Sequence, residues 1–226
     1  LLTVLLVDLP TLAVAEEPEL AAWWRFEEGQ GLLAADSAGK HQDALQGYAA
    51  FAPGVRGNGL KFDGFASRVV RRAAQVPRLT GAFSIEAWIA AQEYSWNWTG
   101  IVDHDQDARA GYFFGIGPQG QIGLQLSVGG RWLAVESAQR LPLRRWSHVA
   151  AVYREGSGVR LFLDGAPAGE LRTEGPLRPA PEAEAKPRDI LIICYSGELE
   201  KTWATMPCPP VASWSNNCTR TVIRSK

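Results

Sequence analysis

Short runs in which apolar and polar side chains alternate recur between about residues 21 and 193. In the run QIGLQLSV at 121–128, every second residue is apolar, with Ile122, Leu124 and Leu126 on one face. Successive side chains of a β-strand point to opposite faces, so this period of two predicts strands that pack one face on a core. Glycine-containing segments such as GPQG, VGGR, EGSG and LDGA separate the runs and predict hairpin turns.

The fold class follows from this organisation. Many short strands, with no predicted amphipathic helix longer than two turns, are typical of an all-β protein. We expect an antiparallel two-sheet β-sandwich (a jelly roll), with a barrel as the alternative. The three cysteines, Cys194, Cys208 and Cys218, all follow this region, so its stability does not depend on a disulfide.

Charge and hydropathy exclude two broad classes of partner. The formal net charge is −1 and no long run of Lys or Arg is present, whereas nucleic-acid binders normally carry a basic patch. We therefore predict no nucleic-acid partner. No stretch approaches the roughly 20 apolar residues of a membrane span.

Three segments are predicted along the chain. Residues 1–15 are apolar and end in Ala13-Val14-Ala15, which is typical of part of a secretory signal. This segment predicts a secreted, periplasmic or cell-surface protein; the alternative is an apolar segment that packs on the domain. Residues 21–193 form the β domain, in which the Pro-rich and charged stretch 172–188 is a loop. The alternation is lost in 194–226, so we expect an irregular tail there.

Five phrases in order carry a resemblance to a known family. They are GLKFDG (59–64), FSIEAWI (83–89), GYFFGIGPQGQIGLQLSVGG (111–130), RRWSHVAAVY (144–153) and VRLFLDGAPAGEL (159–171). Together they resemble the laminin G-like, concanavalin A-like lectin/glucanase jelly roll, the broad family that includes the pentraxins. The segment SWNWTGIVD followed by GYFFGI also resembles lectin-like modules joined to secreted glycoside hydrolases. No closing strand of the family type is found in 194–226, which suggests a frameshift or truncation there; the alternative is a divergent tail.

The resemblance implies a recognition module that binds carbohydrate. Trp96 and Trp98 precede a predicted strand and alternate, so they are candidates for a sugar-stacking platform; the alternative is that they cover the end of the sandwich. Tyr112 in the following strand joins this candidate ligand set. Trp23, Trp24, Trp88 and Trp146 lie in strand patterns and are predicted to be core or sheet-face residues, and His148 a packed strand histidine.

Asp103, Asp105 and Asp107 have the i, i+2, i+4 spacing that glucanases of this fold use for catalysis. We expect Asp105 and Asp107 to lie on a hairpin turn, where Asp commonly caps its own backbone, and we therefore predict no catalytic role. Pentraxin-like proteins take calcium ligands from this hairpin, so the resemblance makes Asp105 and Asp107 candidate Ca²⁺ ligands; the alternative is solvated turn carboxylates.

The leading hypothesis is a non-catalytic carbohydrate-binding module, an accessory domain with a covalent neighbour such as a glycoside hydrolase. A protein–protein adhesion or structural module is the alternative, because laminin G-like domains supply both. A glycan hydrolase is the third hypothesis. The sequence holds no GxSxG, P-loop, HExxH or dinucleotide-binding motif.

Overall fold

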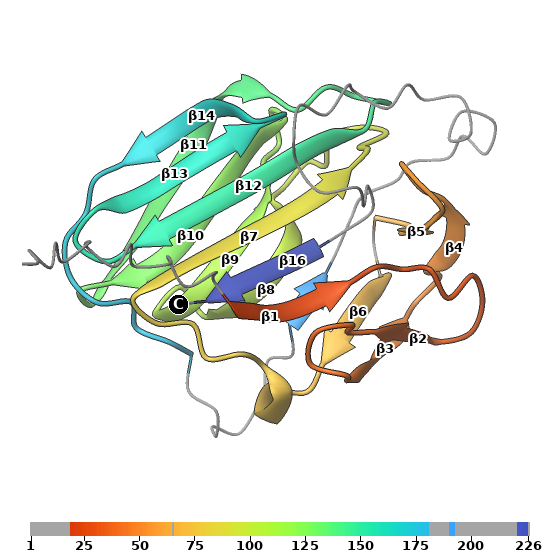
Figure 1. Ribbon diagram of the computed structural model, residues 1–226. Helices are drawn as coiled ribbons and strands as arrows, with labels where there is room; N and C mark the ends of the chain where they lie inside the picture. The colour runs from red at the N-terminus through yellow and green to blue at the C-terminus, as the bar shows by residue number, and fades with distance from the viewer. Residues whose placement is uncertain (1–18, 65, 181–189, 193–220, 226) are drawn as a thin grey trace, which may run out of the picture.

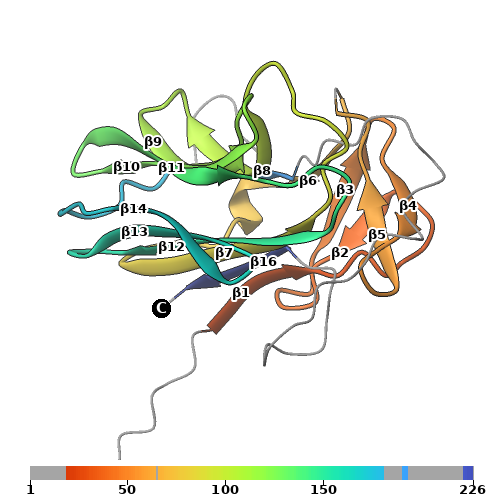
Figure 2. The same ribbon diagram turned by 90° about the horizontal axis from the view of Figure 1, so that it is seen from above.

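Two antiparallel sheets face each other across the core (Figures 1 and 2). The computed structural model describes residues 19–64, 66–180, 190–192 and 221–225. Strands and their connections make up these residues, and the helical turn η1 (Ala73–Gln75) joins two of the strands. The predicted antiparallel two-sheet β-sandwich is confirmed.

The first sheet has six strands in the order β1-β16-β7-β12-β13-β14. Their bounds are β1 Glu19–Trp24, β16 Thr221–Ser225, β7 Ala82–Ile89, β12 Ser147–Arg154, β13 Gly158–Leu163 and β14 Ala166–Leu171.

The second sheet has eight strands in the order β11-β10-β9-β8-β15-β6-β3-β2. Their bounds are β11 Arg131–Arg140, β10 Gln121–Val128, β9 Ala110–Ile116, β8 Thr99–Gln106, β15 Ile190–Ile192, β6 Arg68–Arg71, β3 Gln42–Gln46 and β2 Leu33–Ala35. A separate ribbon pairs β4 (Ala50–Pro53) with β5 (Asn58–Lys61).

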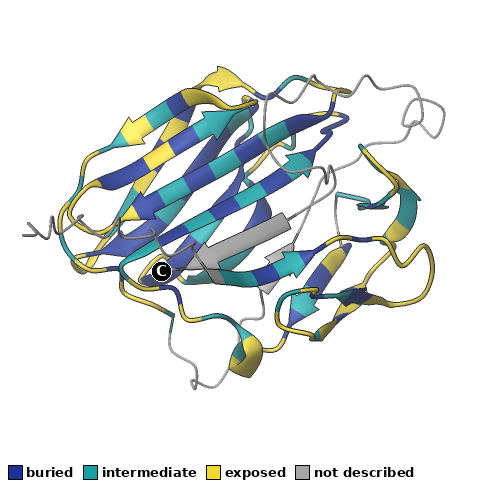
Figure 3. Cartoon of the chain, in the orientation of Figure 1, coloured by how far each residue is buried: buried dark blue, intermediate teal, exposed yellow. Residues whose placement is uncertain are grey.

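The core fills the space between the inner faces of the two sheets. Along β7, partly buried and fully buried residues alternate without interruption, and Figure 3 shows the same alternation on neighbouring strands. The Phe83 ring of the six-stranded sheet lies 5.5 Å from Tyr112 of the eight-stranded sheet and 5.5 Å from Tyr153 of its own sheet, between ring centroids. Aromatic contacts therefore join the two sheets within the core.

The chain near its C-terminus corrects one expectation. Thr221–Ser225 forms β16, which pairs with β1 on one side and β7 on the other. The prediction of an irregular tail is therefore wrong for these residues, since their backbone groups are paired within the sheet. The predicted signal segment 1–15, the three cysteines and the stretch 193–220 lie outside the described residues.

A buried charge cluster joins the two sheets. The Arg71 guanidinium on β6 bonds to Asp36 Oδ2 at 2.8 Å and to Asp43 Oδ2 at 2.7 Å, and all three side chains are at most 1% exposed. Trp24 of β1 donates its indole N–H to Asp43 at 2.6 Å and lies under the guanidinium, 4.6 Å from ring centroid to Cζ. Since β1 belongs to one sheet and β3 and β6 to the other, the cluster connects the two layers.

Asp36 also organises the turn that follows β2. Its Oδ1 accepts the backbone N–H groups of Trp23 at 2.7 Å and Ala38 at 3.0 Å. A Cβ at Gly39 would lie 2.5 Å from Asp36 Oδ2, so a side chain at this position would displace the carboxylate. The Asp-Ser-Ala-Gly turn therefore holds the carboxylate against Arg71.

We predict that Arg71→Met lowers the free energy of unfolding by about 3–5 kcal/mol, because it leaves two buried carboxylates without their cation. Urea unfolding followed by tryptophan fluorescence measures the change. Arg68→Met on the same strand is the matched control; Arg68 bonds Gln46 at the surface, and we expect a change within about 0.5 kcal/mol. Equal effects of the two substitutions would contradict a structural role for the cluster.

The pH dependence of stability tests Asp36. Burial alone raises the pKa of Asp36, but the N–H groups of Trp23 and Gly39 and the charge of Arg71 favour the carboxylate more strongly, so its pKa lies below the ordinary value of 3.8. A folded-state pKa below the unfolded value adds stability above that value, and this stability is lost as the pH falls through the folded-state pKa. Asp36→Asn should therefore lose less stability than the wild type between about pH 5 and pH 2. Equal losses would show that Asp36 does not contribute; Asp107→Asn on an exposed turn is the control.

Candidate functional site

The outer face of the eight-stranded sheet carries a row of residues from four adjacent strands. Phe113 of β9 pairs with Asp103 of β8 on one side and with Gln125 of β10 on the other, and Gln125 pairs with Ala134 of β11. Paired residues of antiparallel strands project to the same side of the sheet. Because Phe114 on β9 is fully buried in the core, Phe113 and its row lie on the outer face. In Figure 2 these strands form the layer drawn above β12, β13 and β14.

Three glycines bring the aromatic rings of this face close to the backbone. A Cβ at Gly115 would lie 2.6 Å from the Phe113 ring, and one at Gly123 would lie 2.6 Å from the Trp98 indole. Gly100 is also next to the Phe113 ring, at 3.2 Å from its Cβ position. The three glycines therefore form a floor on which the two rings rest, and a larger residue would lift them away.

Trp98, Phe113 and Trp132 lie on the same outer face as Gln125. The Trp98 and Phe113 rings meet edge to face, with centroids 6.1 Å apart and planes at 86°, a favourable geometry for aromatic pairs. Trp132 donates its indole N–H to Gln125 Oε1 at 3.3 Å. All three rings are half-buried, so each keeps part of its surface open. We call Trp98, Phe113, Trp132 and Gln125 the outer-face cluster.

Trp96 and Trp98 differ in their surroundings. Trp96 is 88% exposed, whereas Trp98 folds back onto the sheet. Their loop is anchored where the Tyr94 hydroxyl donates to the carbonyl of Leu141 at 2.5 Å. The structure therefore places Trp98 in the outer-face cluster and leaves Trp96 on the exposed part of the same loop.

Tyr112 lies on the opposite side of β9 from the outer-face cluster. It is 2% exposed and packs in the core against Phe83. Burial raises the pKa of Tyr112, so its hydroxyl stays protonated at neutral pH. The structure does not bring Tyr112 together with Trp96 and Trp98, so it is not part of one platform with them.

The three aspartates are divided between a strand and a turn. β8 continues to Gln106, so Asp105 lies in the strand and the expectation that it lies on the turn is wrong. Asp107 follows the strand with a φ of 49°, as a turn residue does. Asp103 Oδ1 accepts the N–H of Asp105 at 3.2 Å, and Asp105 Oδ2 accepts that of Ala108 at 2.9 Å. Both strand carboxylates thus bond to local backbone, and the trio does not share one strand face.

Asp105 and Asp107 are the candidate calcium ligands of this hairpin. Ca²⁺ takes six to eight oxygen ligands, and no group of three acidic, His or Cys side chains suited to a metal is found in the described ranges. Asp105 and Asp107 contribute at most two carboxylates from this hairpin. Calcium binding by this pair stays a prediction.

The remaining aromatic predictions hold. Trp24 and Trp146 are buried in the core, and Trp23 and Trp88 are half-buried sheet residues. His148 packs on the outer face of the six-stranded sheet, with its ring 5.3 Å from that of Trp88 and its Nε2 3.2 Å from Glu86 Oε2. These contacts are those of a packed strand histidine.

Sequence reasoning missed Phe113, Gln125 and Trp132 as site residues. In the structure, Phe113 of β9 and Gln125 of β10 occupy outward positions. However, the pairing register that brings them into one row cannot be predicted from the sequence of either strand alone. The glycines beneath the Phe113 and Trp98 rings, Gly115 and Gly123, were the available signal.

The family model for the concanavalin A-like lectin/glucanases superfamily matches residues 64–187. This chain belongs to that superfamily. The match begins between β5 and β6 and includes the outer-face strands β8–β11 as well as β12–β14. Among curated proteins, none matches the sequence.

Several solved structures share the fold. One is domain 4 of AbnA, a GH43 extracellular arabinanase from Geobacillus stearothermophilus, in complex with arabinotriose: 15% identity, a TM-score of 0.59, and coverage of 93% of this chain and 94% of that one. The binding domain of Paraclostridial Mosquitocidal Protein 1 has 10% identity and a TM-score of 0.63, covering 92% and 49%. The receptor-binding domain of botulinum neurotoxin C/D mosaic serotype has 14% identity and a TM-score of 0.56, covering 92% and 46%. This chain therefore spans about half of each toxin domain, and these likenesses establish the fold.

No helix in the described part of the chain is long and apolar enough to cross a bilayer.

Proposed function

We propose that the chain is a non-catalytic carbohydrate-binding module and that the outer-face cluster is its binding site. The observation that carries the proposal is the set of three half-buried rings on one outer sheet face, one of which is hydrogen-bonded to a side-chain amide. Trp98 and Phe113 are fixed by their contact with each other and with the glycine floor. Rings fixed in this way lose little conformational entropy when a ligand binds.

The cluster has the two properties that a sugar ring requires. A sugar presents apolar C–H faces, on which aromatic rings stack, and hydroxyl groups, which need hydrogen-bond partners. Gln125 keeps its amide NH₂ as a donor while its Oε1 accepts the Trp132 indole. Asp103 in the same row supplies acceptor oxygens, and Glu136 is exposed at the edge of the face. Trp96, two residues before Trp98, is proposed as a further stacking ring.

Local bonding of the aspartates supports the non-catalytic part of the proposal. Glycoside hydrolases use two carboxyl groups that flank the scissile bond, with one acting as acid. Asp103 and Asp105 each accept a hydrogen bond from a neighbouring backbone N–H with one carboxylate oxygen. Asp107 lies on the turn beyond the strand. This arrangement is that of carboxylates that stabilise a hairpin.

The solved neighbours support a recognition module outside the cell. The arabinanase domain is named as part of an extracellular enzyme in complex with arabinotriose, and the toxin domains are named as binding domains. We propose that this chain is likewise extracellular and attached to a larger protein, such as a glycoside hydrolase. Arabinan is therefore the first polysaccharide to test.

Binding to a panel of arabinan, xylan, β-glucan and mannan, measured by affinity electrophoresis and calorimetry, tests the site. We expect one of these to bind, and Trp98→Ala and Trp132→Ala each to weaken it about tenfold, the loss of about 1.4 kcal/mol. Trp96→Ala should weaken binding by a smaller factor. Trp88→Ala is the matched control, because that half-buried tryptophan lies on the outer face of the other sheet, and we expect no change.

Three outcomes would contradict the proposal. Unchanged affinity in both Trp98→Ala and Trp132→Ala would remove the outer-face cluster as the site. Release of reducing sugar from the bound polysaccharide would overturn the non-catalytic assignment. Failure to bind any glycan would favour the protein–protein adhesion alternative.

A further inference from the structure

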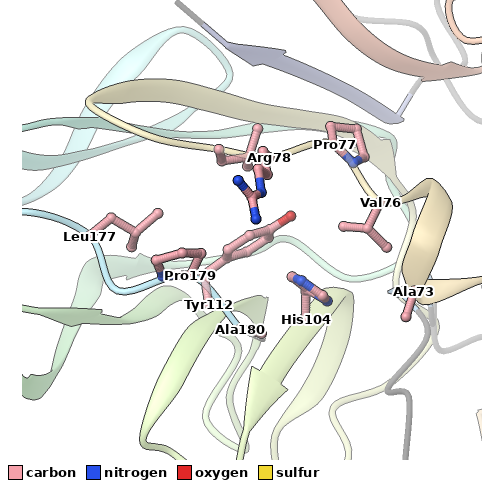
Figure 4. Close-up of a pocket in the computed structure, with 10 residues that line it drawn as sticks. Ala73, Val76, Pro77, Arg78, His104, Tyr112, Leu177, Pro179 and Ala180 are labelled. Atoms are coloured by element: carbon pink, nitrogen blue, oxygen red, sulfur yellow. The ribbon is translucent and has the colours of Figure 1, made fainter. Parts of the chain in front are cut away.

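A small cavity opens at the edge of the sandwich, on the core side of β8 and β9 (Figure 4). Its volume is about 120 Å³. Apolar side chains, among them Val76, Leu177 and Pro179, form most of the wall, and the polar side chains of Arg78, His104 and Tyr112 face it. Since Tyr112 and Phe113 are adjacent on β9 and point to opposite sides, the cavity and the outer-face cluster are separate sites.

The Tyr112 hydroxyl is a buried polar group on the wall of this cavity. Its side chain is 2% exposed, and its hydroxyl is buried with no hydrogen-bond partner. Figure 4 shows this hydroxyl pointing into the space between Arg78, Val76 and His104. A buried hydroxyl without a hydrogen bond costs on the order of 1–3 kcal/mol. A ligand that accepts a hydrogen bond from it would recover part of that cost.

The groups around the cavity favour an anionic acceptor. The guanidinium of Arg78 points toward the Tyr112 ring from the connection between β6 and β7 (Figure 4), and Arg is a donor that is always charged. The His104 ring packs against Tyr112 with centroids 5.6 Å apart. A hydroxyl donor and a guanidinium donor on one cavity match the two oxygens of a carboxylate.

The cavity has fixed walls. The segment after β14 is held to the eight-stranded sheet where the N–H of Gly111 donates to the carbonyl of Arg178 at 2.8 Å and the N–H of Gly129 to that of Pro176 at 3.0 Å. The N–H of Arg178 in turn donates to the carbonyl of Ser127 at 2.8 Å. These bonds place Leu177 and Pro179 opposite the connection that carries Val76 and Arg78.

We propose that this cavity binds the carboxylate of a small organic acid, with Tyr112 and Arg78 as its donors. Drug-sized ligands occupy pockets of about 300–1,000 Å³, so a space of about 120 Å³ admits a carboxylate and the one or two carbons attached to it. The site does not depend on the proposed glycan site, because it lies on the other side of the sheet.

Titration with sodium acetate, followed by the backbone amide resonances of Gly111 and Ala180, tests the site. Acetamide is the control probe, since it has the same shape and no charge. We expect saturable shifts with acetate at millimolar concentration and a dissociation constant at least fivefold higher for acetamide. Tyr112→Phe and Arg78→Met should each raise the acetate dissociation constant at least fivefold.

The melting temperature without acetate shows whether Tyr112→Phe acts through folding. The Tyr112 hydroxyl makes no bond within the described protein, so Tyr112→Phe should leave the melting temperature unchanged or raise it. Tyr153→Phe is the matched control; it removes the hydrogen bond from the Tyr153 hydroxyl to the carbonyl of Gly175 at 3.0 Å and should lower the melting temperature without changing acetate binding.

Three outcomes would overturn the proposal. They are equal affinity for acetate and acetamide, unchanged acetate affinity in Tyr112→Phe, and no response to either probe, which would indicate a cavity that holds only water. Polysaccharide binding by Tyr112→Phe separates this site from the glycan site, because we expect it to equal that of the wild type.

Discussion

Arg71 brings together two carboxylates and an indole that come from distant parts of the first half of the chain. It forms salt bridges with Asp36 and Asp43, and all three side chains are at most 1% exposed. Trp24 donates a hydrogen bond to Asp43 and places its ring face against the guanidinium. A charge buried this deeply is tolerated only when it is paired and hydrogen-bonded. The cluster therefore requires β1, β3 and β6 to be in their places at once, and it ties the edge of one sheet to the other.

Closure of the sandwich sets the functional surfaces. With both inner faces committed to the core, only outward positions on β8–β11 that keep some exposure, such as Phe113 and Trp132, are available for a ligand. Period-two alternation on β9 then assigns Tyr112 to the inside and Phe113 to the outside. β9 consequently contributes to both proposed sites. Phe113 belongs to the aromatic face proposed for sugars, and Tyr112 lines the edge cavity proposed for a carboxylate.

Much of the fold could be predicted because it rests on local signals. Alternation and glycine turns predicted strands with one buried face, and β7 follows that pattern residue by residue. β16 was missed because five residues at the end of the chain carry little pattern, and their place between β1 and β7 is decided by tertiary pairing. Asp105 was placed on the turn because strand ends are set by cross-strand bonds that sequence does not show.

The candidate site could be predicted only in part, for the same physical reason. Trp98 was found because loop tryptophans are candidate ligand contacts, but its partners Phe113 and Trp132 come from other strands and depend on register. Tyr112 was grouped with the tryptophans because it is close in sequence. Whether a residue of β9 faces the core or the solvent depends on the pairing register of the strand, and this register turns Tyr112 to the core.

The central claim is that the outer face of the eight-stranded sheet binds carbohydrate, and chemical-shift mapping tests it most directly. The experiment titrates the labelled protein with an oligosaccharide of the polysaccharide it binds, and follows the indole and backbone N–H resonances. We predict that shifts concentrate at the indoles of Trp98 and Trp132 and at the amides of Gly115 and Gly123. Shifts centred on Trp88 and the outer face of the six-stranded sheet, with none at these positions, would contradict the account.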